Sequence, residues 1–257
     1  TSFPWDELVR WYNGYNIHGL RLYNPESVLS AIKKNKLASY WLSTGDPKLI
    51  RTKLLTAGAA IKETLYRLIF NESIGLPDAL DPGIEVVAPR EFSFDALQKD
   101  SSSIWNLLVA SGYLTITAVN ENIGGASYTL HVKIPNQEIK EHYLVTFMEA
   151  FKEQFTDQAQ YMTFLEDLLA GRVESFRAQL QDFLMQHASF YDFQNESNYH
   201  TFLVGLLAIL IFQYHFHSNA NAGHGRLDLC LIPKSPQVGA YGTQAILLEL
   251  KHLSAKA

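Results

Sequence analysis

The spacing of the apolar residues changes along the chain, and this change constrains the fold most strongly. Over residues 48–70 and again over 136–190, apolar side chains recur at the three- and four-residue spacing of amphipathic helices. The intervening runs 113–119 and 128–134 are instead rich in β-branched and aromatic residues, and Asn and Gly residues separate them as in a hairpin. The sequence therefore predicts a mixed α/β protein.

The N-terminal half divides into a helical part and a smaller mixed part. Residues 1–80 are predicted to be mainly helical, with Pro25 in the first turn of a helix that continues to Lys33. A predicted helix around residues 102–111 precedes the hairpin, and together they resemble a winged-helix-like module within residues 85–135. Residues 136–190 are expected to form a helical connection of two or three helices, one of which ends near Gly171.

The C-terminal block, residues 191–257, has the pattern of a small α/β core. An apolar helix is followed by three short strands, the first two joined by a Gly- and Asn-rich turn. The predicted helix covers residues 195–214, and the strands cover 215–218, 226–232 and 245–251.

Two of these strands carry acidic residues at their ends. Side chains on a strand alternate with period two, so Glu249 and Lys251 point to one face, as do Arg226 and Asp228 on the preceding strand. Pairing of the two strands can bring Asp228 beside Glu249. Two carboxylates a few ångströms apart repel each other unless a proton or a divalent cation lies between them, so the pattern predicts a Mg²⁺ site.

The order of these residues resembles the PD-(D/E)xK nuclease superfamily. In that family an Asp follows a Gly-rich turn at the start of one strand, and an acid-x-Lys triplet closes the next. The resemblance implies a restriction-endonuclease-like α/β core that hydrolyses the phosphodiester bonds of DNA or RNA. Asp228 and Glu249 would hold Mg²⁺ or Mn²⁺, and Lys251 would position or help to deprotonate the attacking water.

The same resemblance assigns roles to residues around this core. The family often adds an acid from the preceding helix, and Glu196 fits that position as a third metal ligand and catalytic residue. His200 follows four residues later on the same helical face. We expect His200 and Arg226 to contact substrate, Arg226 as a phosphate clamp; the alternative for Arg226 is a surface ion pair with Asp228.

A narrower resemblance covers nearly all of the chain. The Glu-x-x-Tyr-His helix start and the segment 218–228 look like the nuclease domain of a family that joins an AAA-ATPase-like domain to a PD-(D/E)xK domain. Upstream segments are similar, in order, to those that follow the nucleotide-binding core of that family. This resemblance implies that residues 1–135 are the C-terminal part of an ATPase-like region. The matching upstream segments are 11–15, 22–25, 40–45, 111–115 and 134–138.

The chain also departs from this family in several places. Asn221 stands where the turn usually carries a glutamate. No Gly-x-x-x-x-Gly-Lys-Ser/Thr loop occurs, so we expect the chain neither to bind nor to hydrolyse ATP. The first residue is not Met, and the last follows Lys251 closely. We therefore expect a fragment whose nuclease-like domain, 191–257, is truncated.

Composition excludes several classes of protein. The single cysteine, Cys230, rules out an intramolecular disulfide and a zinc site built from two or more cysteines. The longest apolar run, 202–212, is shorter than the ~18 residues of a membrane span, and residues 1–10 do not have the pattern of a signal peptide. A cytoplasmic location without membrane contact is expected.

Two other interpretations use the same C-terminal residues. His215 and His217 alternate on a predicted strand and raise the question of a zinc site, although histidines on half-buried strands more often serve packing and hydrogen bonding. Residues 191–257 carry four acids and four fixed bases, so they form no basic surface. This neutrality allows a rival hypothesis, in which an inactive nuclease fold serves as a scaffold or effector module that binds a protein partner.

Overall fold

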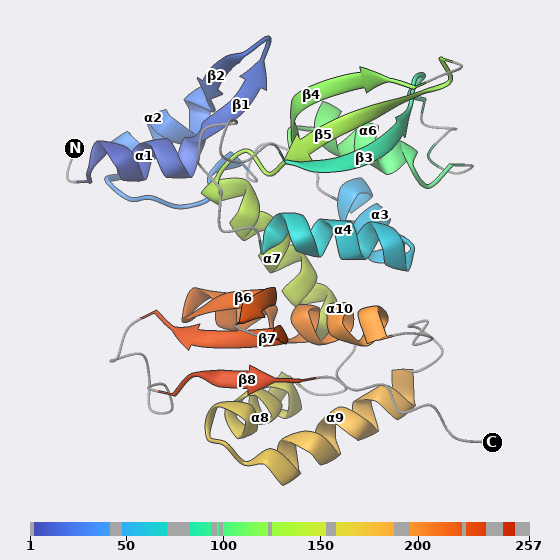
Figure 1. Cartoon of the computed structure of the whole chain (residues 1–257). Helices are drawn as coiled ribbons and strands as arrows, with labels where there is room; N and C mark the ends of the chain where they lie inside the picture. The colour runs from blue at the N-terminus through green and yellow to red at the C-terminus, as the bar shows by residue number, and fades with distance from the viewer. Residues whose placement is uncertain are drawn as a thin grey trace. The chain divides into compact units, whose positions relative to one another are not determined.

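The structure is a computed structural model of the 257-residue chain. It describes residues 3–41, 48–70, 83–93, 97, 100–122, 125–152, 158–187, 196–222, 225–234 and 244–249. Helices alternate with small antiparallel sheets (Figure 1), which confirms the predicted mixed α/β class. The chain divides into two compact units, Thr1–Leu144 and Val145–Ala257. This division lies within α7 (Gln137–Lys152), and the expected boundaries at 135 and 190 stay predictions.

The first unit begins with a helix, a hairpin and a second helix. These are α1 (Trp5–Tyr12), β1 (Asn13–Ile17), β2 (Leu20–Tyr23) and α2 (Pro25–Lys34). The α2 helix confirms the predicted one, because Pro25 occupies its first turn and the Asn24 side chain accepts hydrogen bonds from the backbone N–H groups of Glu26 and Ser27. The hairpin is an addition to a region predicted as mainly helical.

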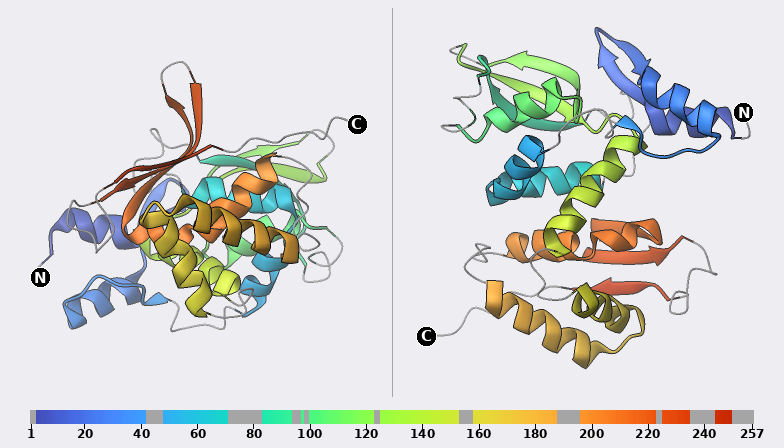
Figure 2. Two further views of the ribbon diagram at one scale, coloured as in Figure 1. Left: turned by 90° about the horizontal axis from the view of Figure 1, so that it is seen from below. Right: turned by 180° about the vertical axis from the view of Figure 1, so that it is seen from behind.

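The rest of the first unit contains two helices and a three-stranded sheet. The helical spacing of residues 48–70 becomes α3 (Lys48–Thr56) and α4 (Ala59–Ile69). The predicted helix and hairpin are confirmed as α6 (Ser103–Ala110), β4 (Thr115–Glu121) and β5 (Ser127–Lys133). A further strand, β3 (Ile84–Pro89), pairs with the other edge of β5, and α6 covers one face of the sheet (Figure 2).

A buried carboxylate connects three segments of this unit. The Glu138 side chain, at the start of α7, is fully buried. Its Oε1 accepts hydrogen bonds from Ser27 Oγ at 2.8 Å, from the Tyr40 N–H at 2.6 Å and from the Trp41 N–H at 2.8 Å. Burial raises the pKa of Glu138, and these donors oppose that increase because they favour the charged form.

A second buried polar pair lies one turn further along α7. His142 Nε2 lies 2.7 Å from the hydroxyl oxygen of Tyr113, and both side chains are buried. The indole of Trp41 packs edge-on against the Tyr113 ring, with centroids 5.1 Å apart. Burial lowers the pKa of His142 to about 4, because a positive charge there would lose its hydration. The imidazole is therefore neutral at pH 7.

The helices of the second unit pack on one another through aromatic side chains. They are α8 (Gln158–Leu169), α9 (Val173–His187) and α10 (Glu196–Leu206). The Tyr161 hydroxyl donates a hydrogen bond to the Leu206 carbonyl at 2.7 Å, and the rings of Phe183 and Phe202 stack with centroids 5.4 Å apart. Gly171, at φ 68°, follows the end of α8 as predicted.

A three-stranded antiparallel sheet completes the second unit, in the order β6-β7-β8. The 3₁₀ helix η2 (Ala208–Phe212) leads into β6 (Tyr214–Ala222), β7 (Gly225–Pro233) and β8 (Ile246–Leu248). The predicted long helix 195–214 is thus divided into α10 and η2. Residues 219–222, predicted as part of a turn, continue β6 because they pair with the start of β7.

Candidate metal centre

The β7 strand presents two different faces, and the candidate site lies on one of them. Leu229 and Leu231 are fully buried, as are Tyr214 and Phe216 on the neighbouring β6. Asp228 therefore lies, by the alternation of strand side chains, on the opposite face and is half-buried. The apolar residues on the first face thus fix which way the carboxylate of Asp228 is turned.

The register of β7 and β8 places a second carboxylate opposite the first. Leu229 pairs with Leu248 and Cys230 pairs with Leu247, in antiparallel order. Continued by one residue, this register sets Asp228 opposite Glu249, whose side chain is exposed. Residues directly opposite each other in such a pair have Cβ atoms ~4.5–5.5 Å apart, which allows two carboxylates to reach one cation.

The α10 helix contacts β7 at Asp228. His200 Nε2 lies 2.8 Å from the backbone carbonyl oxygen of Asp228. A carbonyl oxygen only accepts hydrogen bonds, so Nε2 must carry the proton and donate. Glu196 is the first residue of α10 and precedes His200 by four residues.

His200 is predicted from the sequence to contact substrate, and the structure shows it hydrogen-bonded to protein backbone. The imidazole links α10 to the position of Asp228 in β7. The spacing of Glu196 and His200 indicated that they share a helical face, but no sequence signal indicated the backbone partner. The substrate contact stays a prediction.

The remaining predicted site residues are only partly described. Arg226 pairs with Asn221 in the β6–β7 ladder, but its side chain, like that of Glu196, lies outside the description. Lys251 lies outside the described residues altogether. The structure thus pairs the residues next to Asp228 and Glu249, Leu229 and Leu248, and joins His200 of α10 to the backbone at Asp228.

The donor set suits a hard divalent cation, although it is not complete. Two carboxylates supply the oxygen ligands that Mg²⁺ and Mn²⁺ prefer, and water or substrate oxygens normally fill the other positions. Within the described part of the chain, no group of three or more His, Cys, Asp and Glu side chains is arranged to hold a metal. Glu196 as a third protein ligand stays a prediction.

By strand alternation, the two histidines of β6 lie on the same side of the sheet as Asp228. His217 pairs with Cys230, and His215 pairs with Ile232. The His217 and Cys230 side chains are half-buried, and His215 is exposed. Because the described residues contain no three-ligand cluster, this face offers the zinc interpretation no support.

Comparison with known proteins supports the C-terminal assignment. A family model described as "PD-(D/E)XK nuclease superfamily" matches residues 194–257, which are about a quarter of the chain. This match includes α10, the β6-β7-β8 sheet and all the predicted site residues. The C-terminal part of the chain, from α10 onwards, is therefore similar to the PD-(D/E)XK nuclease superfamily.

The comparison with curated proteins gives one relative of unstated function. The "Uncharacterized protein in vnfD 5'region" of Azotobacter chroococcum mcd 1 is 33% identical over 135 residues. The match covers 52% of this chain but only 22% of that relative. No solved structure matches, and none of these findings supports an ATPase-like region, which stays a prediction. In the described residues, no helix is long and apolar enough to cross a membrane.

Proposed function

We propose that the C-terminal domain hydrolyses phosphodiester bonds in DNA or RNA with a divalent cation held by Asp228 and Glu249. The observation that supports this proposal is the β7–β8 register: its pairs reach Leu229 and Leu248, and continuation by one residue would set the two acids opposite each other. The match of residues 194–257 to the PD-(D/E)XK nuclease superfamily model supports a nuclease-type reaction.

The cation would supply Lewis-acid polarisation of the scissile phosphate and would lower the pKa of a bound water. The chain's own residues have three tasks. Asp228 and Glu249 hold the ion, with Glu196 of α10 proposed as a further ligand. His200 fixes α10 against the backbone at Asp228, so it acts as a positioning residue.

Lys251 is proposed to act at the attacking water. It follows Glu249 by two residues in the sequence, so continuation of the strand would place both on one face. An ammonium group there would orient the water and offset negative charge that develops on the phosphate. Arg226 is proposed to bind a neighbouring phosphate as a bidentate clamp.

The experiment is a cleavage assay of the full 257-residue chain. Labelled single-stranded DNA, double-stranded DNA and RNA are incubated with Mg²⁺, with Mn²⁺ or with EDTA. We expect cleavage that depends on the cation and that falls by about 100-fold or more in Asp228→Asn, Glu249→Gln and Lys251→Met. Asp182→Asn is the matched control, because Asp182 is an exposed acid on α9 of the same unit.

Two results would reject the proposal. One is cleavage that persists in EDTA; the other is equal cleavage by Asp228→Asn and by the Asp182→Asn control. A chain that neither cleaves nucleic acid nor binds Mn²⁺ would instead favour the scaffold hypothesis, in which the same fold binds a protein partner.

A further inference from the structure

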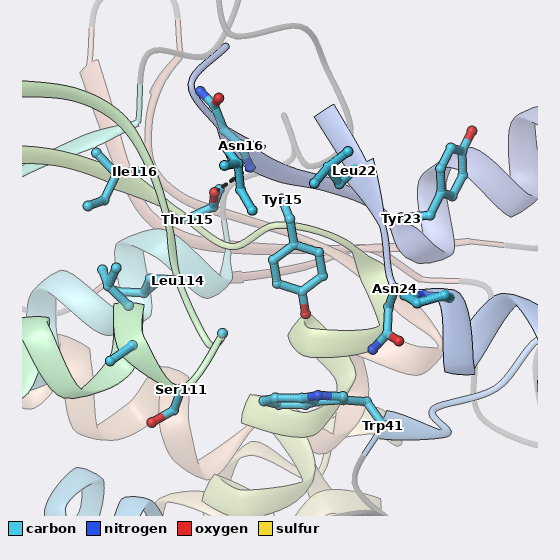
Figure 3. Close-up of a pocket in the computed structure, with 15 residues that line it drawn as sticks. Tyr15, Asn16, Leu22, Tyr23, Asn24, Trp41, Ser111, Leu114, Thr115 and Ile116 are labelled. Atoms are coloured by element: carbon cyan, nitrogen blue, oxygen red, sulfur yellow. Dashed lines mark hydrogen bonds between the residues drawn. The ribbon is translucent and has the colours of Figure 1, made fainter. Parts of the chain in front are cut away.

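The first unit contains a pocket whose lining includes none of the residues proposed for nucleic-acid cleavage. It has a volume of about 580 Å³ and lies between the β1–β2 hairpin, the start of α2 and the segment that joins α6 to β4 (Figure 3). Ligand pockets typically have volumes of ~300–1,000 Å³. Its lining includes the aromatic side chains of Tyr15, Tyr23 and Trp41 and the carboxamides of Asn16 and Asn24.

Two aromatic rings form a rigid wall of this pocket. They converge at Gly112, where an added Cβ would lie 3.5 Å from Trp41 Cζ2 and 3.5 Å from Tyr15 Cε1. Two further contacts hold Trp41 in place. Its backbone N–H donates a hydrogen bond to the buried Glu138, and its indole packs against the Tyr113 ring. A ligand would therefore meet an ordered flat surface.

The amide side chain of Asn24 is also held in place. Its Oδ1 accepts two backbone hydrogen bonds as the N-cap of α2, and this fixes the plane of the carboxamide. In Figure 3 this carboxamide and the Tyr15 ring both extend towards the indole of Trp41. Since Oδ1 is committed to the cap, the amide nitrogen is the donor that Asn24 offers to a ligand.

The charge of the surroundings restricts the ligand further. Among the residues that the structure describes, those lining the pocket include no Lys, Arg, His, Asp or Glu. Behind the wall lies Glu138, whose charge acts with burial to raise the pKa of Tyr15. An anionic group in the pocket would meet no lining cation, so phosphates are disfavoured.

We propose that this pocket binds an uncharged nucleoside, with its base against the Trp41 indole and the Asn24 amide donating to the edge of the base. Aromatic side chains stack on bases of every kind, and Asn carboxamides hydrogen-bond to base edges. This inference goes beyond the proposed nuclease function and does not depend on it, because it needs neither the cation nor the second unit.

Calorimetric titration of the full chain with adenosine, guanosine, cytidine and uridine, without metal, tests the proposal. We expect saturable binding of at least one nucleoside, and weaker binding of its 5′-monophosphate. Ala110→Trp would fill the pocket from its rim and abolish binding, because Ala110 is exposed and lines it. Ala60→Trp is the matched control, since Ala60 is an exposed alanine of α4 and is not among the lining residues.

Two further variants separate the contributions of the ring and the amide. Trp41→Leu should weaken binding by about 5- to 150-fold, which corresponds to a stacking contribution of ~1–3 kcal/mol. Asn24→Asp keeps an acceptor for the α2 cap but removes the donor, so it should weaken binding while the fold is retained. The proposal is overturned if no nucleoside gives saturable binding, if the monophosphate binds more tightly, or if Ala110→Trp binds as well as Ala60→Trp.

Discussion

Replacement of His142 by Gln should remove a specific part of the pH dependence of stability. In the folded chain burial lowers the pKa of His142 from 6.5 to about 4. The unfolded chain therefore binds more protons than the folded one between these two values. Stability from this group is fully present above pH 6.5 and is lost as the pH falls towards 4.

The size of this effect follows from the shift of the pKa. A shift from 6.5 to about 4 corresponds to about 3 kcal/mol at 1.36 kcal/mol per pH unit. Gln at position 142 would not titrate but could still hydrogen-bond to the Tyr113 hydroxyl. The difference in unfolding free energy between wild type and variant should therefore change by about 3 kcal/mol between pH 7 and pH 4.

Tryptophan fluorescence during urea unfolding is a suitable assay for this prediction. All four tryptophans, Trp5, Trp11, Trp41 and Trp105, belong to the first unit, so the signal follows that unit. Tyr113→Phe serves as a control. Because burial is the cause of the lowered pKa, removal of the hydroxyl should leave the pH dependence in place. Parallel pH curves for wild type and His142→Gln would refute the reasoning.

Three other substitutions test contacts elsewhere in the fold. Glu138→Ala leaves two buried N–H donors without their acceptor and should lower the unfolding free energy of the first unit by about 2–6 kcal/mol in the same urea assay; a loss under 1 kcal/mol would contradict this. Asp167, whose pKa is lowered by hydrogen bonds at the α8–α9 turn, stabilises the second unit above pH 3.8 and loses this effect below it. Circular dichroism of Asp167→Asn should show a weaker acid transition, and an unchanged transition would count against this role. Gly14→Ala should destabilise the first unit by at least 1–3 kcal/mol, because φ is 131° and the new Cβ would overlap the Pro135 carbonyl oxygen. Gly58→Ala, with open space around it, should change stability far less, and similar losses in both variants would exclude the steric explanation.

Local signals in the sequence predicted elements whose ends are fixed by neighbouring residues. The Asn24-Pro25 pair marks the start of α2, and Gly171 marks the end of α8. The strand β3 was not predicted, because it pairs with a segment about forty residues away and has no turn of its own to mark it. The extension of β6 into residues 219–222 was missed for a related reason: cross-strand pairing overcomes the weak strand preference of Asn and Ala.

The candidate site was predictable to the extent that it follows from strand alternation. That rule predicts Asp228 and Glu249 at comparable positions of neighbouring strands; the observed pairs reach the adjacent residues, Leu229 and Leu248, and the pairing of the two acids stays a prediction. The His200 contact, the His142–Tyr113 pair and the Trp41 pocket depend on residues distant in the sequence. No spacing rule links such residues, so only the tertiary structure reveals them.

Calorimetric titration with Mn²⁺ tests the central claim most directly, because it measures the shared cation without requiring turnover. The wild-type chain should bind Mn²⁺ saturably near neutral pH. Asp228→Asn and Glu249→Gln should each weaken this binding by at least tenfold, and Asp182→Asn should leave it unchanged. Binding of equal strength in all four proteins, or in none, would contradict a metal centre formed by Asp228 of β7 and by Glu249, which follows β8.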